Sequence, residues 1–509
     1  MTEPFSELRG ARRDLGALLA FRRSALSRSH SRRLWWAAAL ALVLTATAMV
    51  GPAYLGGDFP RERSGSLLAL MPSMAVGFLA LAIFSAVASG GGREVVPRDQ
   101  AVAFPVSTTT DHLGALLMAP LNIAWFAQAW TLFGIASYAL GPDKLWAYQL
   151  PLLLWVLAST AIAQIFGWLA EGVRRGPNGI VTFRLIVAVV FGWVASLVIT
   201  GVLAGVLDRS PTIWLLTWML DGASGRWLGW SGGNVVLLVL VLGSALLGAV
   251  PARWALHRPM REELRLESGR HRVRPAPTTD LAMLLRVDRS AVWRSVPLRR
   301  GLAVLALMPG VVALAGDLEW RMLTVLPGLV ASGAALLFGV NTWCLDGRGA
   351  LWRESLPVSP RLSFYARALV LLEVLTASAV ITLVLAALRA GRPTAAELVA
   401  LLCATVVVAV QVVAAGMRWS IARPFSVDLR SARATPAPPV VMAGYSARLA
   451  LATTMTGLLF SGLAQVSDVR VTLFVTLLLL LWSTWRLERA AGRWEDPVTR
   501  SRVIATVAG

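Results

Sequence analysis

Residues 232–250 read GGNVVLLVLVLGSALLGAV, an apolar run without a single charged side chain. In an α-helix, a run of this length nearly crosses the ~30 Å hydrocarbon core of a bilayer. Similar runs recur along a chain of 509 residues that is 56% hydrophobic and only 15% charged. Because a helix satisfies its own backbone hydrogen bonds within one segment, we expect an all-α, multi-pass membrane protein.

About twelve such spans can be drawn, six in each half of the chain. Amphipathic interfacial helices are expected before each half, in the N-terminal segment 1–33 and at the end of a cytoplasmic linker at 251–300. A cytoplasmic tail follows at 488–509. Because six is even, each half starts and ends on the same side of the membrane, so the halves 34–250 and 301–487 would form two parallel repeats, a pseudo-dimer. The predicted spans are 34–55, 67–89, 113–139, 146–170, 183–206 and 232–250, then 301–315, 322–342, 366–388, 395–417, 447–466 and 472–487.

The net charge of +20 follows this predicted topology. If the N-terminus is cytoplasmic, most of the 48 Lys and Arg residues fall on the cytoplasmic side, which is the positive-inside pattern. The excess charge is therefore explained by orientation and by anionic lipid headgroups, and nucleic-acid binding is not expected. We expect a protein of the cytoplasmic (inner) membrane with both termini in the cytoplasm.

Residue usage argues against several kinds of active site. Lys144 is the only lysine, and Asp143 and Leu145 flank it, so the Gly-Lys-Ser/Thr end of a phosphate-binding P-loop is missing. The four histidines show no metal-ligand spacing, and Cys344 and Cys403 are too few for a metal cluster. No catalytic set, metal site or cofactor is therefore expected on this chain.

Two short segments nearly repeat one another. AFPVS begins at Ala103 and SLPVS begins at Ser355, each after a pair of predicted spans. A second match, of the form DLxxLLxxxRSAxxRS followed by RR, begins at Asp14 and again at Asp280. Two matches in the same order indicate an internal duplication, as in many transporters. Proline with a following serine predicts, in both halves, a loop that turns into a helix.

The second half carries a more specific pattern. NTWCLDGRG at 341–349 leads to LPVS at 356–359, and SIARP follows at 420–424. In this order the motifs resemble the membrane subunit of an ABC-2 type exporter. The first half departs from the pattern, with three glycines at 90–92 where an Asp-Gly pair would be expected. In that family, the loop between the second and third spans carries a coupling helix that docks on a separate ATPase.

The resemblance implies a permease subunit that is not itself an enzyme. A partner ABC ATPase, expected in two copies, would hold the ATP and magnesium. The cargo would be a hydrophobic or amphiphilic compound, a drug or antibiotic first and a lipid next. The expected ATPase-coupling residues are Glu94, Arg98, Asp99, Phe104, Pro105, Val106 and Ser107 in the first half, and Asp346, Arg353, Glu354, Leu356, Pro357, Val358 and Ser359 in the second.

Polar side chains inside the predicted spans are candidates for a substrate path, because burying them in hydrocarbon is costly. The amides are also candidates for hydrogen bonds between helices, and we favour that interpretation for them. For the glutamate we favour an ion pair near the interface, with Arg367 or Arg448. The residues concerned are Asn122, Gln128, Gln164, Glu373 and Gln411.

Two other functions stay open. A secondary transporter driven by an ion gradient needs paired ionisable residues deep in the bilayer, and Glu373 is the only candidate. A membrane enzyme or an assembly scaffold needs a polar cluster at the outer face, where the predicted loops are short. The exception is 207–231, which carries four tryptophans and predicts either a re-entrant hairpin or an ordinary aromatic belt.

Overall fold

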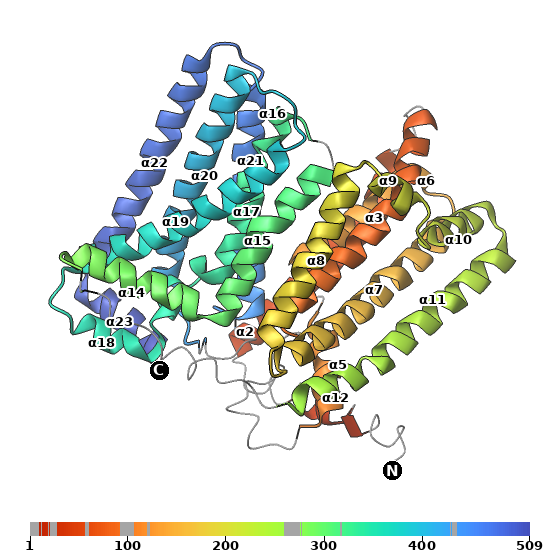
Figure 1. The fold of residues 1–509 in the computed structure, drawn as a ribbon, viewed down its shortest axis with the longest axis horizontal. Coiled ribbons are helices and arrows are strands. Elements are labelled where there is room, and N and C mark those ends of the chain that lie inside the picture. The colour runs from red at the N-terminus through yellow and green to blue at the C-terminus, as the bar shows by residue number, and fades with distance from the viewer. Residues whose placement is uncertain are drawn as a thin grey trace. The chain divides into compact units, whose positions relative to one another are not determined.

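The computed structural model describes residues 10–258 and 275–509, except for 12, 19, 21–27, 56–60, 92–105, 120–122, 276, 316–317, 428 and 430–434. Every regular element within these residues is helical (Figure 1). Nine of the described helical segments are long and apolar enough to cross a membrane, which fits the all-α membrane fold that the apolar runs predict. They are Ala38–Leu55, Leu67–Ala88, Leu145–Arg174, Gly179–Leu197, Trp227–Leu256, Val296–Leu314, Pro360–Ala387, Ala395–Ala422 and Val469–Glu495.

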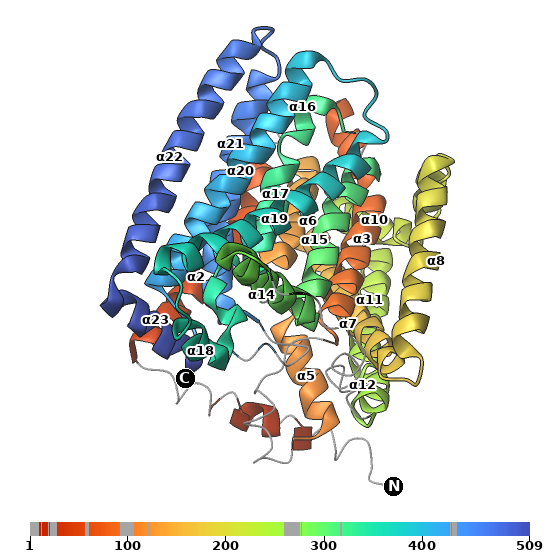
Figure 2. The ribbon, with the colours of Figure 1, turned by 60° about the vertical axis from the view of Figure 1, so that its left-hand side comes forward.

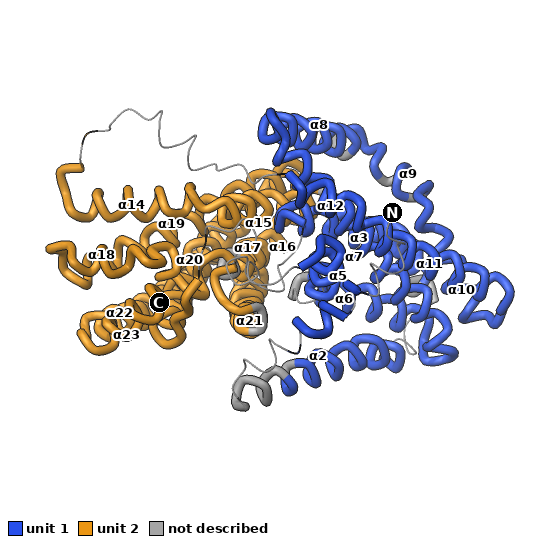
Figure 3. Tube along the Cα trace, turned by 90° about the horizontal axis from the view of Figure 1, so that it is seen from below, with its two compact units in different colours: residues 1–264 blue, residues 265–509 orange. Residues whose placement is uncertain are grey.

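The chain divides into two compact units, Met1–Leu264 and Arg265–Gly509 (Figure 3). The boundary falls inside the segment 251–300 that the sequence predicts as a linker. Unit 1 contains α2 (Arg28–Leu55), α3 (Arg61–Ala88), α5 (Thr108–Met118), α6 (Ile123–Leu140), α7 (Leu145–Arg174), α8 (Gly179–Ile199), α9 (Leu203–Asp208), α10 (Ile213–Ser224), α11 (Trp227–Leu247) and α12 (Ala249–Leu256).

Unit 1 is organised around α7, the helix against which α3, α10, α11 and α12 all pack. α2 packs on α6 in the same unit. Phe78, Leu132, Tyr148 and Met219 are among the fully or nearly fully buried side chains of the core that these helices share. α7 can serve as the centre because more than half of its spanning stretch is buried inside the unit.

Unit 2 begins with an amphipathic surface helix and ends with a short helix after its last long one (Figure 2). Its elements are α14 (Asp280–Arg294), α15 (Val296–Ala315), α16 (Trp320–Leu323), α17 (Leu326–Ala334), the π-turn η1 (Ala335–Gly339), the 3₁₀ turns η2 (Thr342–Leu345) and η3 (Gly347–Gly349), α18 (Ala350–Glu354), α19 (Pro360–Ala387), α20 (Ala395–Ala422), α21 (Pro439–Leu463), α22 (Val469–Glu495) and α23 (Pro497–Ala508).

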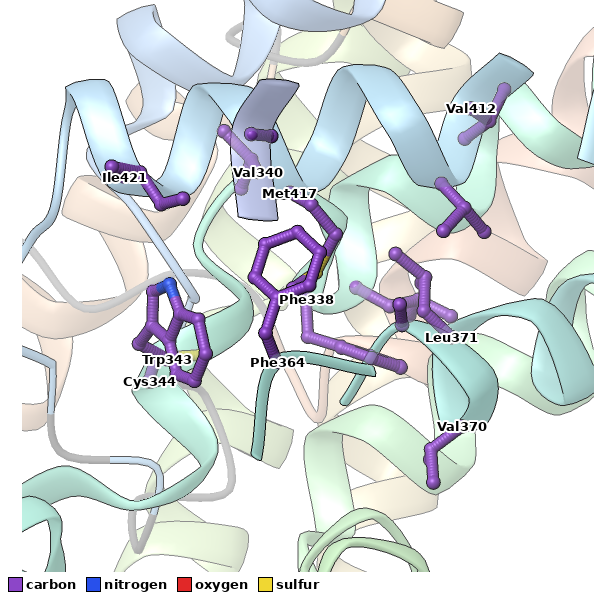
Figure 4. Packing of buried hydrophobic residues seen from close by; sticks show 14 of the residues in the cluster. Phe338, Val340, Trp343, Cys344, Phe364, Val370, Leu371, Val412, Met417 and Ile421 are labelled. Atoms are coloured by element: carbon purple, nitrogen blue, oxygen red, sulfur yellow. The ribbon is translucent and has the colours of Figure 1, made fainter. Parts of the chain in front are cut away.

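In unit 2, α15 packs on α19, and α20 packs on α22. The largest core cluster lies where η1, η2, α19 and α20 meet. Figure 4 shows Phe338, Phe364 and Met417 together in this cluster, with Trp343 beside Ile421. This core therefore holds the loop that follows η1 against two long helices. The N-terminal surface helix expected in 1–33 is described only in part, with residues 13–18 helical.

Two predicted spans are not single helices. In place of 113–139 the structure has α5 and α6, and α5 ends two residues before Pro120, a residue that disfavours a helix just before it. In place of 322–342 it has α16, α17 and η1 in succession, with Pro327 in the first turn of α17. Proline lacks the N–H that a continuous helix would need at this position. Span 301–315, which looked short, is lengthened at its start, because α15 begins at Val296.

The tryptophan-rich segment 207–231 contains a helix of its own. α10 packs on α7 and α11, and Gly225, with a φ of 81°, makes the turn between α10 and α11. Trp230 Nε1 donates a hydrogen bond to the carbonyl of Ala147 at the start of α7. The segment is thus a helical hairpin fastened to the central helix of unit 1.

Candidate functional site

Both Pro-Val-Ser segments lead into a helix through a serine cap. Ser359 is the N-cap of α19, and its Oγ accepts a hydrogen bond from the Leu362 N–H at 3.2 Å. Ser107 is the N-cap of α5, and its Oγ accepts from the Thr110 N–H at 3.1 Å. A serine oxygen in this position satisfies one of the free N–H groups of the first helical turn. The serine that ends the duplicated motif therefore caps a helix in each unit.

The loop of unit 2 presents an exposed apolar face. Leu351 and Trp352 of α18 are each 62% exposed, and Pro357 is exposed as well. Leu356 and Val358 are half-buried beside them, and Ser359 is exposed. Large apolar side chains grouped on a surface mark a site of interaction more often than single ones do. The sequence did not single out Leu351 or Trp352, since two apolar residues in a short loop form no periodic pattern.

Beneath this face lies a buried cluster of two aspartates and two arginines. Arg367 Nη2 donates to Asp288 Oδ1 at 2.9 Å and to both oxygens of Asp346 at 2.8 Å. Arg353 donates to both oxygens of Asp288, with 3.1 Å between Nη2 and Oδ2. Arg353 Nη1 also reaches Asp346 Oδ1 at 3.3 Å. The cluster joins α14, the η2–η3 turn, α18 and the start of α19.

The charges of the cluster balance, and this makes their burial tolerable. Asp288 and Arg367 are fully buried, and Arg353 is nearly so. Burial alone would raise the pKa of Asp288, but the guanidinium groups of Arg367 and Arg353 outweigh that effect and hold the pKa below its usual value. Breaking such a network by removing one charge is costly, because it leaves an uncompensated charge in a dry site. The loop is therefore fixed to α14 and α19 as one piece.

The last helix of the chain supports the same loop. Trp343 of η2 and Trp494 of α22 are stacked, and Arg500 Nε of α23 donates to Glu354 Oε1 at 2.6 Å. Val503 and Val507 of α23 are buried in the same core. A small pocket lies between these elements, lined by residues that include Asp346, Arg353, Ile504 and the two tryptophans. The predicted tail 488–509 is thus the end of α22 and a helix packed against α18.

In each unit, a polar side chain of a long helix forms a hydrogen bond with the backbone at the N-terminal start of the loop. In unit 2, Ser420 Oγ of α20 accepts a hydrogen bond from the Thr342 N–H at 2.9 Å. In unit 1, Gln164 Nε2 of α7 donates to the carbonyl of Gly91. Near these hydrogen bonds, a glycine of the long helix also lies against the backbone of the preceding segment. A Cβ on Gly416 would stand 2.8 Å from the carbonyl oxygen of Gly339, and a Cβ on Gly167 would stand 3.0 Å from the carbonyl oxygen of Ala86.

The first of the two predicted coupling loops is described only at its end. Glu94, Arg98, Asp99, Phe104 and Pro105 lie outside the described residues, whereas Val106 and Ser107 are half-buried at the start of α5.

Just beyond them, His112 is fully buried. Its Nδ1 accepts from Trp168 Nε1 at 3.0 Å, and its Nε2 lies 2.9 Å from the carbonyl of Ala245. These contacts fit a neutral imidazole and fasten α5 to α7 and α11.

Glu373 forms an ion pair, but neither of the predicted partners is the one it contacts. Arg289 of α14 binds its carboxylate with both Nε and Nη2, at 2.8 Å for the Nε–Oε2 contact. Arg367 instead binds Asp288 and Asp346, and six helical residues place its side chain about 120° around α19 from that of Glu373. Both members of the pair are about half exposed. This geometry agrees with the interpretation of Glu373 as part of a surface ion pair. It does not agree with a buried ionisable group at this position.

The other candidates for a substrate path are not brought together. Gln164 holds the Gly91 carbonyl, and Gln411 Oε1 accepts from Thr456 Oγ1 at 3.1 Å, so both join neighbouring segments. Gln128 is half-buried in α6, and Asn122 lies outside the described residues. Gln164 and Gln411 thus act as hydrogen-bonding groups between segments.

The sequence analysis did not predict the role of Asp288, although the spacing of its neighbours on the helix could have indicated it. It stands four residues after Leu284 and four before Val292, and both of these are buried on the inner face of α14. A carboxylate in the apolar stripe of an amphipathic helix needs a partner, so its pairing could have been anticipated.

Within the described residues, no group of three or more His, Cys, Asp or Glu side chains is arranged to hold a metal ion. No protein-family model matches the chain, and no curated protein or solved structure matches it significantly. Any statement of function consequently depends on the residues themselves.

Proposed function

We propose that this chain is the transmembrane subunit of an ATP-driven exporter and receives force from a separate ATPase through the loop 340–359. One observation carries the proposal: an exposed apolar face, Leu351 and Trp352, stands on a buried ion cluster that connects the loop to α14 and α19. Such a loop needs no chemistry of its own. It must be rigid and tied to long helices, so that movement of a bound partner moves them too.

The cluster supplies this connection. A displacement of α18 moves Arg353, which is bonded to Asp288 on α14 and lies beside Asp346. Arg367 holds the same two carboxylates from α19. Moving one member without the others would expose or separate buried charges, which is costly. A partner that binds the loop differently in two states would therefore bias the position of α19.

A fused pseudo-dimer of about twelve spans is part of the proposal. In its support, the first predicted span packs on the third and the fourth on the sixth in both units, as α2 on α6 and α7 on α11, then α15 on α19 and α20 on α22. The two serine caps at Ser107 and Ser359 occupy the same place in this order. Two loops would engage two copies of the ATPase, which would hold ATP and magnesium.

The cargo that we infer is a hydrophobic or amphiphilic compound, a drug or antibiotic or else a lipid, exported across the cytoplasmic membrane. Its support is the apolar character of the described spans, together with the surface pairing of Glu373 with Arg289. An exchange driven by an ion gradient would need an ionisable group within the bundle. In this proposal both termini and both loops face the cytoplasm.

Co-purification in mild detergent tests the proposal. The tagged chain, extracted from its native membrane, should bring with it a P-loop ATPase at about two copies, identified by mass spectrometry. The double variant Leu351→Ser, Trp352→Ser should lose most of this ATPase, because the exposed apolar face supplies the contact. Pro357→Ala and Glu354→Gln should lower the stimulated ATPase activity while leaving membrane insertion unchanged.

A matched control is Leu388→Ser, at the other end of α19, where the leucine is 68% exposed. It removes a similar exposed side chain and should leave the ATPase bound. Purification of the wild-type chain alone, with substrate transport in vesicles that lack ATP, would instead establish a secondary transporter.

A further inference from the structure

Four arginines gather where α20, α21 and α22 pack on one another. Arg423 and Arg448 both lie over the ring of Trp419, with their guanidinium carbons 4.6 Å and 5.5 Å from its centroid. Arg486 of α22 is within electrostatic range of Arg418 on α20. Arg418, Arg448 and Arg486 belong to α20, α21 and α22, and Arg423 directly follows α20.

No described carboxylate neutralises this cluster. The only carboxylate of α20 is Glu397, which caps the opposite end, and α21 contains none. On α22, Glu488 and Glu495 both bind Arg361. Glu488 is two residues from Arg486, so the two side chains point about 160° apart around the helix. Asp428, in the loop after α20, lies outside the described residues.

Two aromatic side chains lie beside these arginines, and buried hydrogen-bonding groups there lack partners. Tyr445 is only 2% exposed, and its ring centroid is 5.0 Å from that of Trp419. Tyr445 Oη, Trp419 Nε1 and Ser446 Oγ are buried without a hydrogen-bond partner among the described residues. Tyr445 also interacts electrostatically with Arg486. Buried donors without partners are rare in native proteins and call for an explanation.

Neighbouring residues place the cluster at the level of lipid headgroups. Arg486 lies over Trp482 and Arg489 over Trp485, and both tryptophans are about half exposed on α22. Exposed tryptophans on spanning helices mark the boundary between hydrocarbon and headgroups. Basic pockets between spanning helices at such a boundary recognise phosphate-bearing headgroups.

We propose that Arg418, Arg423, Arg448 and Arg486 form a binding site for a phosphate group, occupied by the headgroup of an anionic phospholipid that seats between α20, α21 and α22. The phosphate neutralises arginines that otherwise repel one another, and guanidinium groups bind it with charge-assisted hydrogen bonds. The acyl chains lie against the apolar surface of α20 and α22. The site needs no ATPase, so it stands or fails separately from the exporter proposal.

Native mass spectrometry of the full chain in nanodiscs tests the site. The nanodiscs contain phosphatidylcholine with or without phosphatidylglycerol. The wild type should retain phosphatidylglycerol in preference to phosphatidylcholine. Arg418→Gln with Arg486→Gln should lower the retained phosphatidylglycerol about tenfold, because two charge-assisted contacts are removed. Arg423→Gln with Arg448→Gln is a second, independent pair in case the first variant does not fold.

The control pair is Arg389→Gln with Arg392→Gln, which removes the same charge from exposed positions in the loop between α19 and α20. It should leave retention unchanged. Equal losses in control and test pairs would show a general effect of net charge and overturn the site. A parallel measurement adds inorganic phosphate to the protein in phosphatidylcholine nanodiscs. Stabilisation by phosphate alone, lost in the test pairs without any lipid preference, would assign the arginines to a soluble anion and overturn the lipid assignment.

Discussion

The indole rings of Trp343 and Trp494 lie 3.7 Å apart between centroids and within 4° of parallel. Trp343 belongs to the loop that follows η1, and Trp494 stands near the end of α22. Both are nearly fully buried. The stack therefore joins the C-terminal part of unit 2 to the loop that we propose as the contact with the ATPase.

Trp494→Ala should destabilise unit 2 by about 3 kcal/mol, the lower end of what a buried aromatic ring contributes. Neither indole N–H has a hydrogen-bond partner within the described residues, so the loss is one of packing alone. Thermal denaturation in detergent measures it. Trp485→Ala, which removes a half-exposed tryptophan nine residues earlier on α22, should cost much less. Similar losses in the two variants would contradict the importance of the stack.

Asp288→Asn should destabilise unit 2 by roughly 3–5 kcal/mol, because two buried guanidinium groups would then face one carboxylate. Asp280→Asn, in the exposed first turn of the same helix, is the matched control and should cost under about 1 kcal/mol. Chemical denaturation of the two variants gives the comparison. If Asp280→Asn were the more destabilising change, the buried cluster would not be what holds the loop 340–359 to α14 and α19.

The same aspartate predicts a dependence on pH. Its pKa in the folded protein lies below the ordinary 3.8, so its contribution is fully present above pH 3.8 and is lost as the pH falls through the lower, folded value. The wild type should therefore lose stability more steeply than Asp288→Asn below about pH 4. Melting temperatures between pH 3 and pH 7 measure this. Parallel curves for the two proteins would argue that Asp288 is not charged in the folded state.

Gly416→Ala should destabilise unit 2 by about 1–3 kcal/mol, because the new Cβ would overlap the carbonyl oxygen of Gly339. Gly462→Ala, in α21, meets nothing within 4 Å and should be neutral or stabilise the helix by up to about 1 kcal/mol. The opposite signs make this pair a sharp test by thermal denaturation. A neutral Gly416→Ala would mean that α20 is not held against η1 as closely as the structure has it.

The parts of the fold that follow from local sequence could be predicted, and the contacts between distant segments could not. Apolar runs such as 395–417 predict a long helix because the property is local. The serine at 359 predicts a cap for the same reason. Asp288 and Arg367, by contrast, are far apart in sequence, and no pattern in either segment predicts that the two side chains pair. Glu373 shows the same limit: its ionic role could be inferred, but its partner on α14 could not.

Cysteine labelling tests the orientation, and the structure changes how it must be done. Burial raises the pKa of the Cys344 thiol to about 12, so this residue should not react with a maleimide at pH 7.5 from either side of the membrane. It cannot report topology. Cysteines placed at Asp143 and Ser355 can, since both positions are exposed.

On intact cells, an impermeant maleimide should label Asp143→Cys and leave Ser355→Cys unlabelled until the membrane is permeabilised. This outcome follows from the positive-inside pattern, which places the arginine-rich loops in the cytoplasm. The wild-type protein should stay unlabelled in both conditions and react only after denaturation in detergent. Labelling of Ser355→Cys from outside would invert the proposed topology and place the loop 340–359 out of reach of a cytoplasmic ATPase.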